Sequence, residues 1–186
     1  MVNIRKAKPT DAEVAVPLII DAIGNIAEQM TGETNPVSVE HEMIALFKRQ
    51  DNRHSFLNTW IAETDKDVVG VMVFYTGAQA LQLDANLVEW LEEKNGLPVD
   101  IPPEAHVDEY YIDTVCVDPR FQGQGIGSLL LKHAEVVARE EESAKLALNV
   151  EIEKEAAIRL YERLGYQIAE PWVIYGGQFH HMVKRV

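Results

Sequence analysis

Apolar residues recur along this chain with two different periods. Alternating or β-branched stretches predict strands, at 2–7, 56–64, 68–76, 106–117, 144–151, 166–170 and 179–186. Apolar residues at helical spacing predict helices, over 10–26, 39–50, 78–96, 128–141 and 153–165. Helices and strands are intermixed along the chain, so we expect a mixed α and β fold around one sheet.

Length and composition fit a single domain, which we expect to span 1–186. The 186 residues are 47% hydrophobic, enough to bury a sizeable core. No apolar run approaches the ~20 residues of a membrane span, and the N-terminal segment lacks the apolar stretch of a secretory signal. Cys116 is the single cysteine, which argues against disulfides and cysteine metal clusters. These features predict a cytoplasmic protein with no membrane partner and no metal ion.

The charge of the chain is acidic overall but unevenly distributed. A formal net charge of −13 argues against a nucleic-acid partner, which needs a basic face. Residues 119–134 include no acid, although Arg120 and Lys132 are present. Residues 84–113 instead carry nine carboxylates and one base, Lys94. An anionic ligand therefore fits the first segment, while the second is either a cation-binding wall or a solvated acidic face.

Residues 122–127, QGQGIG, lie between a predicted strand and a predicted helix. Glycines lack the Cβ atoms that would obstruct a phosphate, and a helix N-terminus presents free N–H groups with about half a positive charge. The spacing is not that of a P-loop, because no lysine follows in register. It also lacks the third glycine of a dinucleotide fingerprint. Glu151, at the end of the next strand, nevertheless keeps a dinucleotide-binding oxidoreductase open as an alternative.

The stretch 122–127 matches the Q/R-x-x-G-x-G/A pattern of the GNAT N-acetyltransferase superfamily, which the chain resembles over roughly residues 107–167. A second block of that family's pattern is matched by Leu148, Val150, Ala157, Tyr161, Gly165 and Tyr166. The resemblance implies the GNAT fold, a central mixed, mostly antiparallel twisted sheet of about seven strands flanked by helices. The family usually joins its third and fourth strands by a short turn, whereas residues 77–106 here form a helical insertion.

The resemblance also implies acetyl transfer from acetyl-CoA to a primary amine by direct attack in a ternary complex. The glycine segment and the following helix would bind the pyrophosphate, and main-chain groups of the fourth strand would hold the thioester carbonyl. Lys154 stands where the family frequently has asparagine, so that contact is open. The expected cofactor-binding residues are Val115, Cys116, Val117, Gln122, Gly123, Gln124, Gly125, Ile126, Gly127, Ser128, Asn149 and Lys154.

Tyr161 is a candidate for the proton transfer to the leaving thiolate. It matches the family's general-acid tyrosine, although the apolar spacing of 157–164 also fits a plain core face of a helix. A thiol with a pKa near ~8.5 leaves tolerably without help, so the tyrosine should assist rather than be indispensable.

Asp113 is the candidate for accepting the proton of the amine. Alternation places it on the same strand face as Val115 and Val117. An alkylamine with a pKa near ~10.4 is almost wholly protonated at neutral pH, so a carboxylate there could orient and deprotonate it. Glu109 and Glu63 are weaker candidates.

These features together favour an acetyl-CoA-dependent N-acetyltransferase whose acceptor is a small cationic amine. A catalytically inactive acyl-CoA-binding module of the same fold is the main alternative. Family members often dimerise, so a homodimer is compatible with the sequence. His180 and His181 are adjacent in a predicted strand and would point to opposite faces, which makes them a poor metal pair.

Overall fold

The computed structural model describes residues 1–186, which form a mixed α/β fold around one seven-stranded sheet. The strand order is β1-β2-β3-β4-β5-β7-β6, and every neighbouring pair is antiparallel except β4 and β5. The strands are β1 (Asn3–Lys6), β2 (Thr59–Glu63), β3 (Val68–Thr76), β4 (Tyr110–Val117), β5 (Lys145–Glu151), β6 (Gln167–Ile174) and β7 (Gly177–Arg185). The mostly antiparallel sheet predicted from the sequence is thus confirmed, and it rules out the parallel doubly wound sheet of a dinucleotide-binding oxidoreductase.

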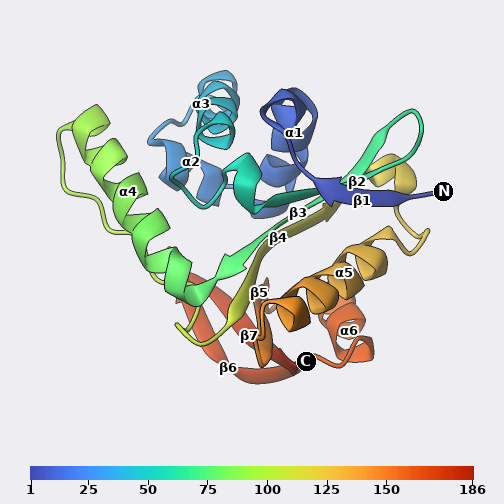
Figure 1. The fold of residues 1–186 in the computed structure, drawn as a ribbon. Helices are drawn as coiled ribbons and strands as arrows, with labels where there is room; N and C mark the ends of the chain where they lie inside the picture. Colours follow the sequence, from blue (N-terminus) through green and yellow to red (C-terminus); the bar gives the residue numbers. More distant parts are fainter.

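Helices cover both faces of the sheet (Figure 1). Figure 1 shows α1, α2 and α3 on one face and α5 and α6 on the other, with α4 beyond one end of the strands. The helices are α1 (Ala12–Ile23), α2 (Ile26–Thr31), α3 (Pro36–Lys48), α4 (Gly77–Asn95), α5 (Ile126–Glu140) and α6 (Glu155–Arg163). Short 3₁₀ turns, η1 (Pro9–Asp11), η2 (Phe56–Asn58) and η3 (Pro119–Phe121), precede α1, β2 and α5.

Several predicted elements have boundaries that differ by a few residues from those expected, and two of these differences have a clear local cause. The helix expected over 10–26 is divided, because Gly24 has a φ of 58° and its N–H closes α1 on the Ile20 carbonyl. The strand expected from residue 106 begins at Tyr110, because 106–109 form a turn in which the Glu109 N–H bonds the His106 carbonyl.

The apolar residues divide into two layers, one on each face of the sheet. Alternating β3 residues, Val71, Val73 and Tyr75, pack with α1, α3 and α4. Their neighbours Met72 and Phe74 pack with α5 on the other face. Each layer is continuous and buried, so the sheet is a rigid platform between two apolar layers.

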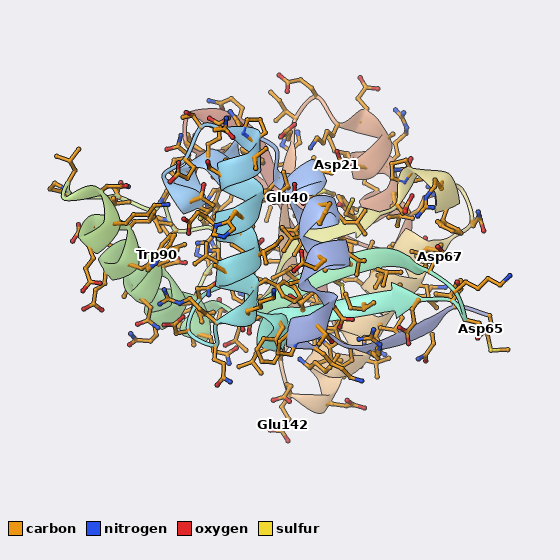
Figure 2. All side chains as sticks on the ribbon, turned by 90° about the horizontal axis from the view of Figure 1, so that it is seen from above. Asp21, Glu40, Asp65, Asp67, Trp90 and Glu142 are labelled. Carbon is orange, nitrogen blue, oxygen red and sulfur yellow. The ribbon has the colours of Figure 1, made fainter.

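The insertion predicted at 77–106 is a helix of about five turns, α4, followed by a loop. Thr76 caps α4, since its hydroxyl accepts the Gln79 N–H at 3.2 Å and Gln79 returns a bond to the Thr76 N–H. Figure 2 shows α4 beside α3, at the opposite end of the sheet from the β2–β3 turn that Asp65 and Asp67 mark. The Trp90 ring lies under the cations of Arg49 and Lys94, at 5.8 and 5.2 Å. The insertion is therefore packed onto the domain as part of it.

The sheet opens between β4 and β5. Only three residue pairs join these strands, ending at Ile112 with Leu148. At that point β4 also bulges, because Val73 pairs with Thr114 while Phe74 pairs with Ile112, which leaves Asp113 as the extra residue. The bulge and the splayed strands together leave a gap in the middle of the molecule.

Candidate active site

A cavity of about 270 Å³ occupies the gap between β4 and β5. The α1–α2 segment, the end of β5 and α6 complete its walls. Of the residues predicted from the sequence, eight line this cavity: Asp113, Val115, Cys116, Val117, Gln122, Asn149, Lys154 and Tyr161. The remaining six, Gly123–Ser128, follow Gln122 directly but lie outside the cavity lining.

The glycine segment presents a row of free N–H groups next to the cavity. Gly123 and Gly125 have φ values of 76° and 81°, and a Cβ built on either would meet nothing within 4 Å. The helix α5 begins at Ile126 rather than at Ser128, with Gly125 as a cap that offers no side chain. No N–H group from Gln122 to Ser128 has an acceptor within the protein. The Ile126 side chain is buried in the core, so only its main chain is available to a ligand.

The edge of β4 that faces the cavity is unpaired. Because the Asp118 N–H bonds Val69 on β3, the alternate residues Val117 and Val115 direct their N–H and C=O groups away from β3. There β5 has already separated, so these groups have no strand partner. The Gln122 side-chain amide donates a hydrogen bond to the Val117 carbonyl oxygen at 3.2 Å. The N–H groups of Val115 and Val117 remain available as donors to a ligand.

Tyr161 reaches the cavity from α6 and also packs against the core. Its ring lies 6.0 Å from that of Tyr166 and packs against the core layer beneath α6. Burial alone raises the pKa of its hydroxyl to about 12, with no hydrogen bond contributing. The hydroxyl is therefore protonated at neutral pH and free to donate into the cavity.

A buried cluster of charges forms the end of the cavity away from the glycine segment. The Arg53 guanidinium is 2% exposed and lies 2.6 Å from Asp84, 2.5 Å from Glu104 and 3.5 Å from Asp113. Three carboxylates thus surround one cation. Burial raises the pKa of the Asp84 and Glu104 carboxyls, an effect that Arg53 opposes. Arg53, Glu104 and Asp113 line the cavity, whereas Asp84 holds the guanidinium from the α4 side.

The position of Asp113 corrects the expectation from alternation. Its carboxylate accepts the Tyr75 hydroxyl at 2.6 Å, and Tyr75 belongs to the layer beneath α1 and α3. Val115 and Val117 pack in the opposite layer. The bulge at Asp113 shifts the alternation by one residue, so Asp113 does not share a face with Val115 and Val117.

His54 lies beside the charged cluster and also lines the cavity. It is 2% exposed, and neither ring nitrogen has a hydrogen-bond partner. Burial lowers its pKa to about 4, so the ring is neutral at physiological pH. Both ring nitrogens are themselves buried, so His54 lines the cavity without presenting an accessible nitrogen to it.

Asn149 lines the cavity, and its side chain is hydrogen-bonded within the protein. Its amide donates to the Glu104 carbonyl and the Tyr111 hydroxyl and accepts from His181. All of these partners belong to the protein, so the side chain holds the loop before β4 in place. Sequence analysis identified neither Tyr111 nor His181 as part of the site.

His181 continues this network to the outer side of the sheet. Together with His106 and Glu109 it forms a group whose potential metal-ligating atoms lie within 4.8 Å of one another. His181 Nε2 already lies 3.1 Å from Glu109, and His106 Nε2 lies 2.7 Å from Glu170. These hydrogen bonds explain why the three side chains lie together, because they connect the loop before β4 to the β6–β7 hairpin.

The cations near the glycine segment are partly neutralised. Arg120 pairs with Asp118 at 2.7 Å, and Lys154 pairs with Glu151 at 3.4 Å. An anion at this place would therefore depend chiefly on main-chain donors. Cys116 lines the cavity as well, but burial raises the pKa of its thiol to about 11, which leaves it protonated and unreactive at neutral pH.

A second cavity, of about 350 Å³, adjoins the first. The two share Ile26, Glu151, Ile174 and Phe179, and the second lies between the α1–α2 turn and the β6–β7 turn. Tyr175 in that turn has a positive φ of 45°, an uncommon conformation for a bulky residue. The second cavity thus continues the first past the end of β5 toward the β6–β7 turn.

Sequence and fold are similar to those of known acetyltransferases. A model of the acetyltransferase (GNAT) family matches residues 22–166. The chain belongs to this family. A crystal structure of an acetyltransferase superposes with a TM-score of 0.80 at 29% identity, over 99% of both chains.

Two curated relatives match shorter stretches of this GNAT chain. The ribosomal protein bS18-alanine N-acetyltransferase of Escherichia coli K12 is 40% identical over 63 residues, which are 34% of this chain and 43% of that protein. An uncharacterized N-acetyltransferase of Methanocaldococcus jannaschii is 37% identical over 75 residues, 40% of this chain and 31% of that protein. The match thus spans less than half the length of either relative. No helix of this chain is both long and apolar enough to cross a membrane.

Four groups of the site were not identified from the sequence: Arg53, His54, Glu104 and Tyr111. Glu104 was only one of the nine carboxylates of residues 84–113, and Arg53 and His54 lie in a short loop without any motif. Arg53 is 31 positions from Asp84 and 51 from Glu104, so no short sequence pattern indicates that these residues meet. The fold alone brings these groups together.

Proposed function

We propose that this chain is an acetyl-CoA-dependent N-acetyltransferase that transfers the acetyl group directly to a primary amine in a ternary complex. The observation that supports this most is the order of groups along one continuous site. Free N–H groups lie at one end, an unpaired strand edge and the Tyr161 hydroxyl in the middle, and buried carboxylates at the other end. That order matches the pyrophosphate, thioester and amine of the two substrates.

The residues of the glycine segment fit the pyrophosphate. The N–H groups of 122–128 are unsatisfied, and the space beside Gly123 and Gly125 is open. Main-chain donors at a helix N-terminus bind phosphate without a cation, which suits a chain of net charge −13. Acetyl-CoA supplies the acetyl group as a thioester. The Val115 and Val117 N–H groups are placed to bind its carbonyl oxygen, and Tyr161 to donate a proton to the sulfur.

The carboxylate end of the site favours a cationic acceptor. Glu104 and Asp113 line the cavity, and the Arg53 guanidinium is the single cation among three carboxylates, which leaves an excess of negative charge. A protonated amine entering through the adjoining cavity would add the missing positive charge. We retain Asp113 as the carboxylate expected to interact with this ammonium, and residues 77–106 as the segment that supplies the negative wall through Asp84 and Glu104.

The function is tested by thiol release from acetyl-CoA with a panel of amines. The panel should contain diamines, amino acids and a peptide with N-terminal alanine, the last because the E. coli relative acts on ribosomal protein bS18. We expect turnover, with diamines favoured, and a kcat/KM that falls as salt rises, since the exposed carboxylates of residues 84–113 that attract a cation are screened over ~8 Å at physiological ionic strength. Binding of acetyl-CoA without turnover of any amine would indicate an inactive acyl-CoA-binding module instead. Preference for neutral acceptors, with no salt dependence, would contradict the cationic acceptor alone.

A further inference from the structure

We propose that Glu104, rather than Asp113, accepts the proton of the attacking amine. This inference rests on the proposed function and adds the identity of the proton acceptor. Glu104 lies in the loop between α4 and β4, a segment outside the two sequence blocks that resemble the GNAT pattern. Its carboxylate lines the cavity and is 9% exposed.

The two carboxylates differ in their partners and in their exposure. Asp113 accepts the Tyr75 hydroxyl on one oxygen and the Thr114 hydroxyl on the other, and its side chain is 4% exposed. Glu104 accepts one Arg53 N–H on Oε1 and the Tyr111 hydroxyl on Oε2, and its side chain is 9% exposed. A carboxylate has about four acceptor positions, so each has acceptor positions to spare, and Glu104 is the more exposed of the two. Asp113 is held by two hydroxyl groups of the sheet, those of Tyr75 and Thr114.

A directed chain of hydrogen bonds fixes the Glu104 carboxylate. The Asn149 amide nitrogen has two acceptors, so its oxygen is the atom that faces His181, and His181 Nδ1 donates to it at 2.7 Å. Asn149 donates to the Tyr111 hydroxyl at 3.1 Å, which in turn donates to Glu104 at 2.9 Å. Every donor in the chain points toward Glu104, and such chains strengthen one another. Tyr111, Asn149 and His181 are therefore positioning residues.

The proton and electron changes balance as follows. The ammonium gives one proton to Glu104, and the nitrogen electron pair attacks the thioester carbonyl carbon. The C–N bond forms and the C–S bond breaks, while the thiolate takes a proton from Tyr161. The second nitrogen proton restores Tyr161 by way of solvent, and Glu104 releases its proton to solvent after the amide leaves. The products are the amide, free CoA thiol and one proton.

The groups around Glu104 determine its titration. Arg53 lowers its pKa, while burial and the charge of Asp113 raise it, with a net rise above 4.5. Tyr111 on β4 donates to it, Asp84 on α4 shares Arg53, and Tyr175 in the β6–β7 turn lies close enough to feel its charge. Burial and the charge of Asp113 keep the pKa of Glu104 above its ordinary value, so this carboxylate accepts a proton at a smaller free-energy cost than an exposed carboxylate does.

The decisive measurement is the pH profile of kcat/KM with a diamine for Glu104→Gln. In the unaltered protein kcat/KM should be flat from neutral pH up to the pKa of the amine, because carboxylate and ammonium together are the reactive state. Without the acceptor only neutral amine reacts, so kcat/KM should rise about tenfold per pH unit. The loss should be about 10²-fold or more at pH 7 and shrink toward pH 10. Acetyl-CoA affinity should not change.

Matched variants separate this role from a structural one. Glu89→Gln removes an exposed carboxylate of α4 that forms no ion pair, and its kcat/KM should stay within about threefold at every pH. Tyr111→Phe removes one donor to Glu104, which raises the pKa of that carboxyl and moves the acid limb of the profile to higher pH. If Glu104→Gln fails to fold, Glu104→Asp keeps the charge and should keep the flat profile at a lower rate.

Three results would overturn the proposal. An equal loss at all pH values in Glu104→Gln would make Glu104 structural, and no loss would make it dispensable. A profile rising with pH in Asp113→Asn but not in Glu104→Gln would assign the proton to Asp113. If the unaltered protein binds acetyl-CoA but turns over no amine, the proposed function itself fails. The unaltered protein is therefore assayed first, before any variant is interpreted.

Discussion

Replacing Arg53 by methionine is a direct test of the buried charge cluster. The guanidinium holds Asp84 by two bonds of 2.6 and 2.9 Å and Glu104 by one of 2.5 Å, with Asp113 at 3.5 Å. Methionine fills a comparable length with apolar atoms. It leaves three carboxyl groups buried together without a cation, so the substitution isolates the electrostatic role of the arginine.

The expected loss of stability is large and depends on pH. Removing one partner of a buried ion pair costs about 3–5 kcal/mol. Even with Arg53 present, burial holds the pKa of the Asp84 and Glu104 carboxyls above the ordinary value. Without the cation those folded-state pKa values must rise further, and each further unit costs about 1.4 kcal/mol at a pH where the groups are ionised in the unfolded chain. Because the folded state binds the extra protons, the free energy of unfolding should fall as pH rises through this range.

Urea unfolding of both proteins at several pH values from 5 to 8 gives the required numbers. The difference in unfolding free energy between the unaltered protein and Arg53→Met should be smallest at pH 5 and reach about 3–5 kcal/mol at pH 8. Arg5→Met is the control, since Arg5 also pairs with two carboxylates but is 25% exposed, and should cost about 1 kcal/mol or less. A difference for Arg53→Met below that of the control, or one that does not change with pH, would refute the account of the cluster.

Two further substitutions concern the middle of the cavity. Tyr161→Phe keeps the packed ring and removes a hydroxyl with no protein partner, so the melting temperature should hold while kcat falls about 10²-fold; an unchanged kcat under conditions where chemistry is rate-limiting would leave Tyr161 structural. Cys116→Ala should keep kcat within about threefold, because burial raises the pKa of the thiol to about 11 and keeps it protonated; loss of turnover with unchanged acetyl-CoA affinity would instead implicate the thiol.

Periodic and motif-bearing parts of the chain were predictable from the sequence. Alternation identified β2 and β3, and the apolar spacing of residues 83–91 identified α4 to within a residue of each end. The glycine segment and Tyr161 each lie within a short sequence pattern that can be identified without knowing the fold. Each of these signals lies within one element or one turn, which is why sequence alone could reveal it.

The bulge and the charge cluster lay beyond such reasoning. Alternation places Asp113 with Val115, but a single unpaired residue in β4 reverses its face, and no residue type marks that bulge. Arg53, Glu104 and His181 are contributed by segments far apart in the chain and meet through tertiary packing. Composition showed that residues 84–113 were rich in acids but could not show which of them are buried.

Acetyl-CoA binding by Gly125→Asp tests the central claim most directly. The substitution places a side chain and a negative charge where the free N–H groups of 122–128 await a pyrophosphate. Gly96→Asp is the matched control, since Gly96 also has a positive φ, 67°, with nothing within 4 Å of a built Cβ, and it ends α4 away from the site. Calorimetry should show acetyl-CoA affinity reduced at least about tenfold in Gly125→Asp and unchanged in Gly96→Asp, with similar melting temperatures. Unchanged affinity in a folded Gly125→Asp protein would contradict the assignment of the glycine segment as the acetyl-CoA site.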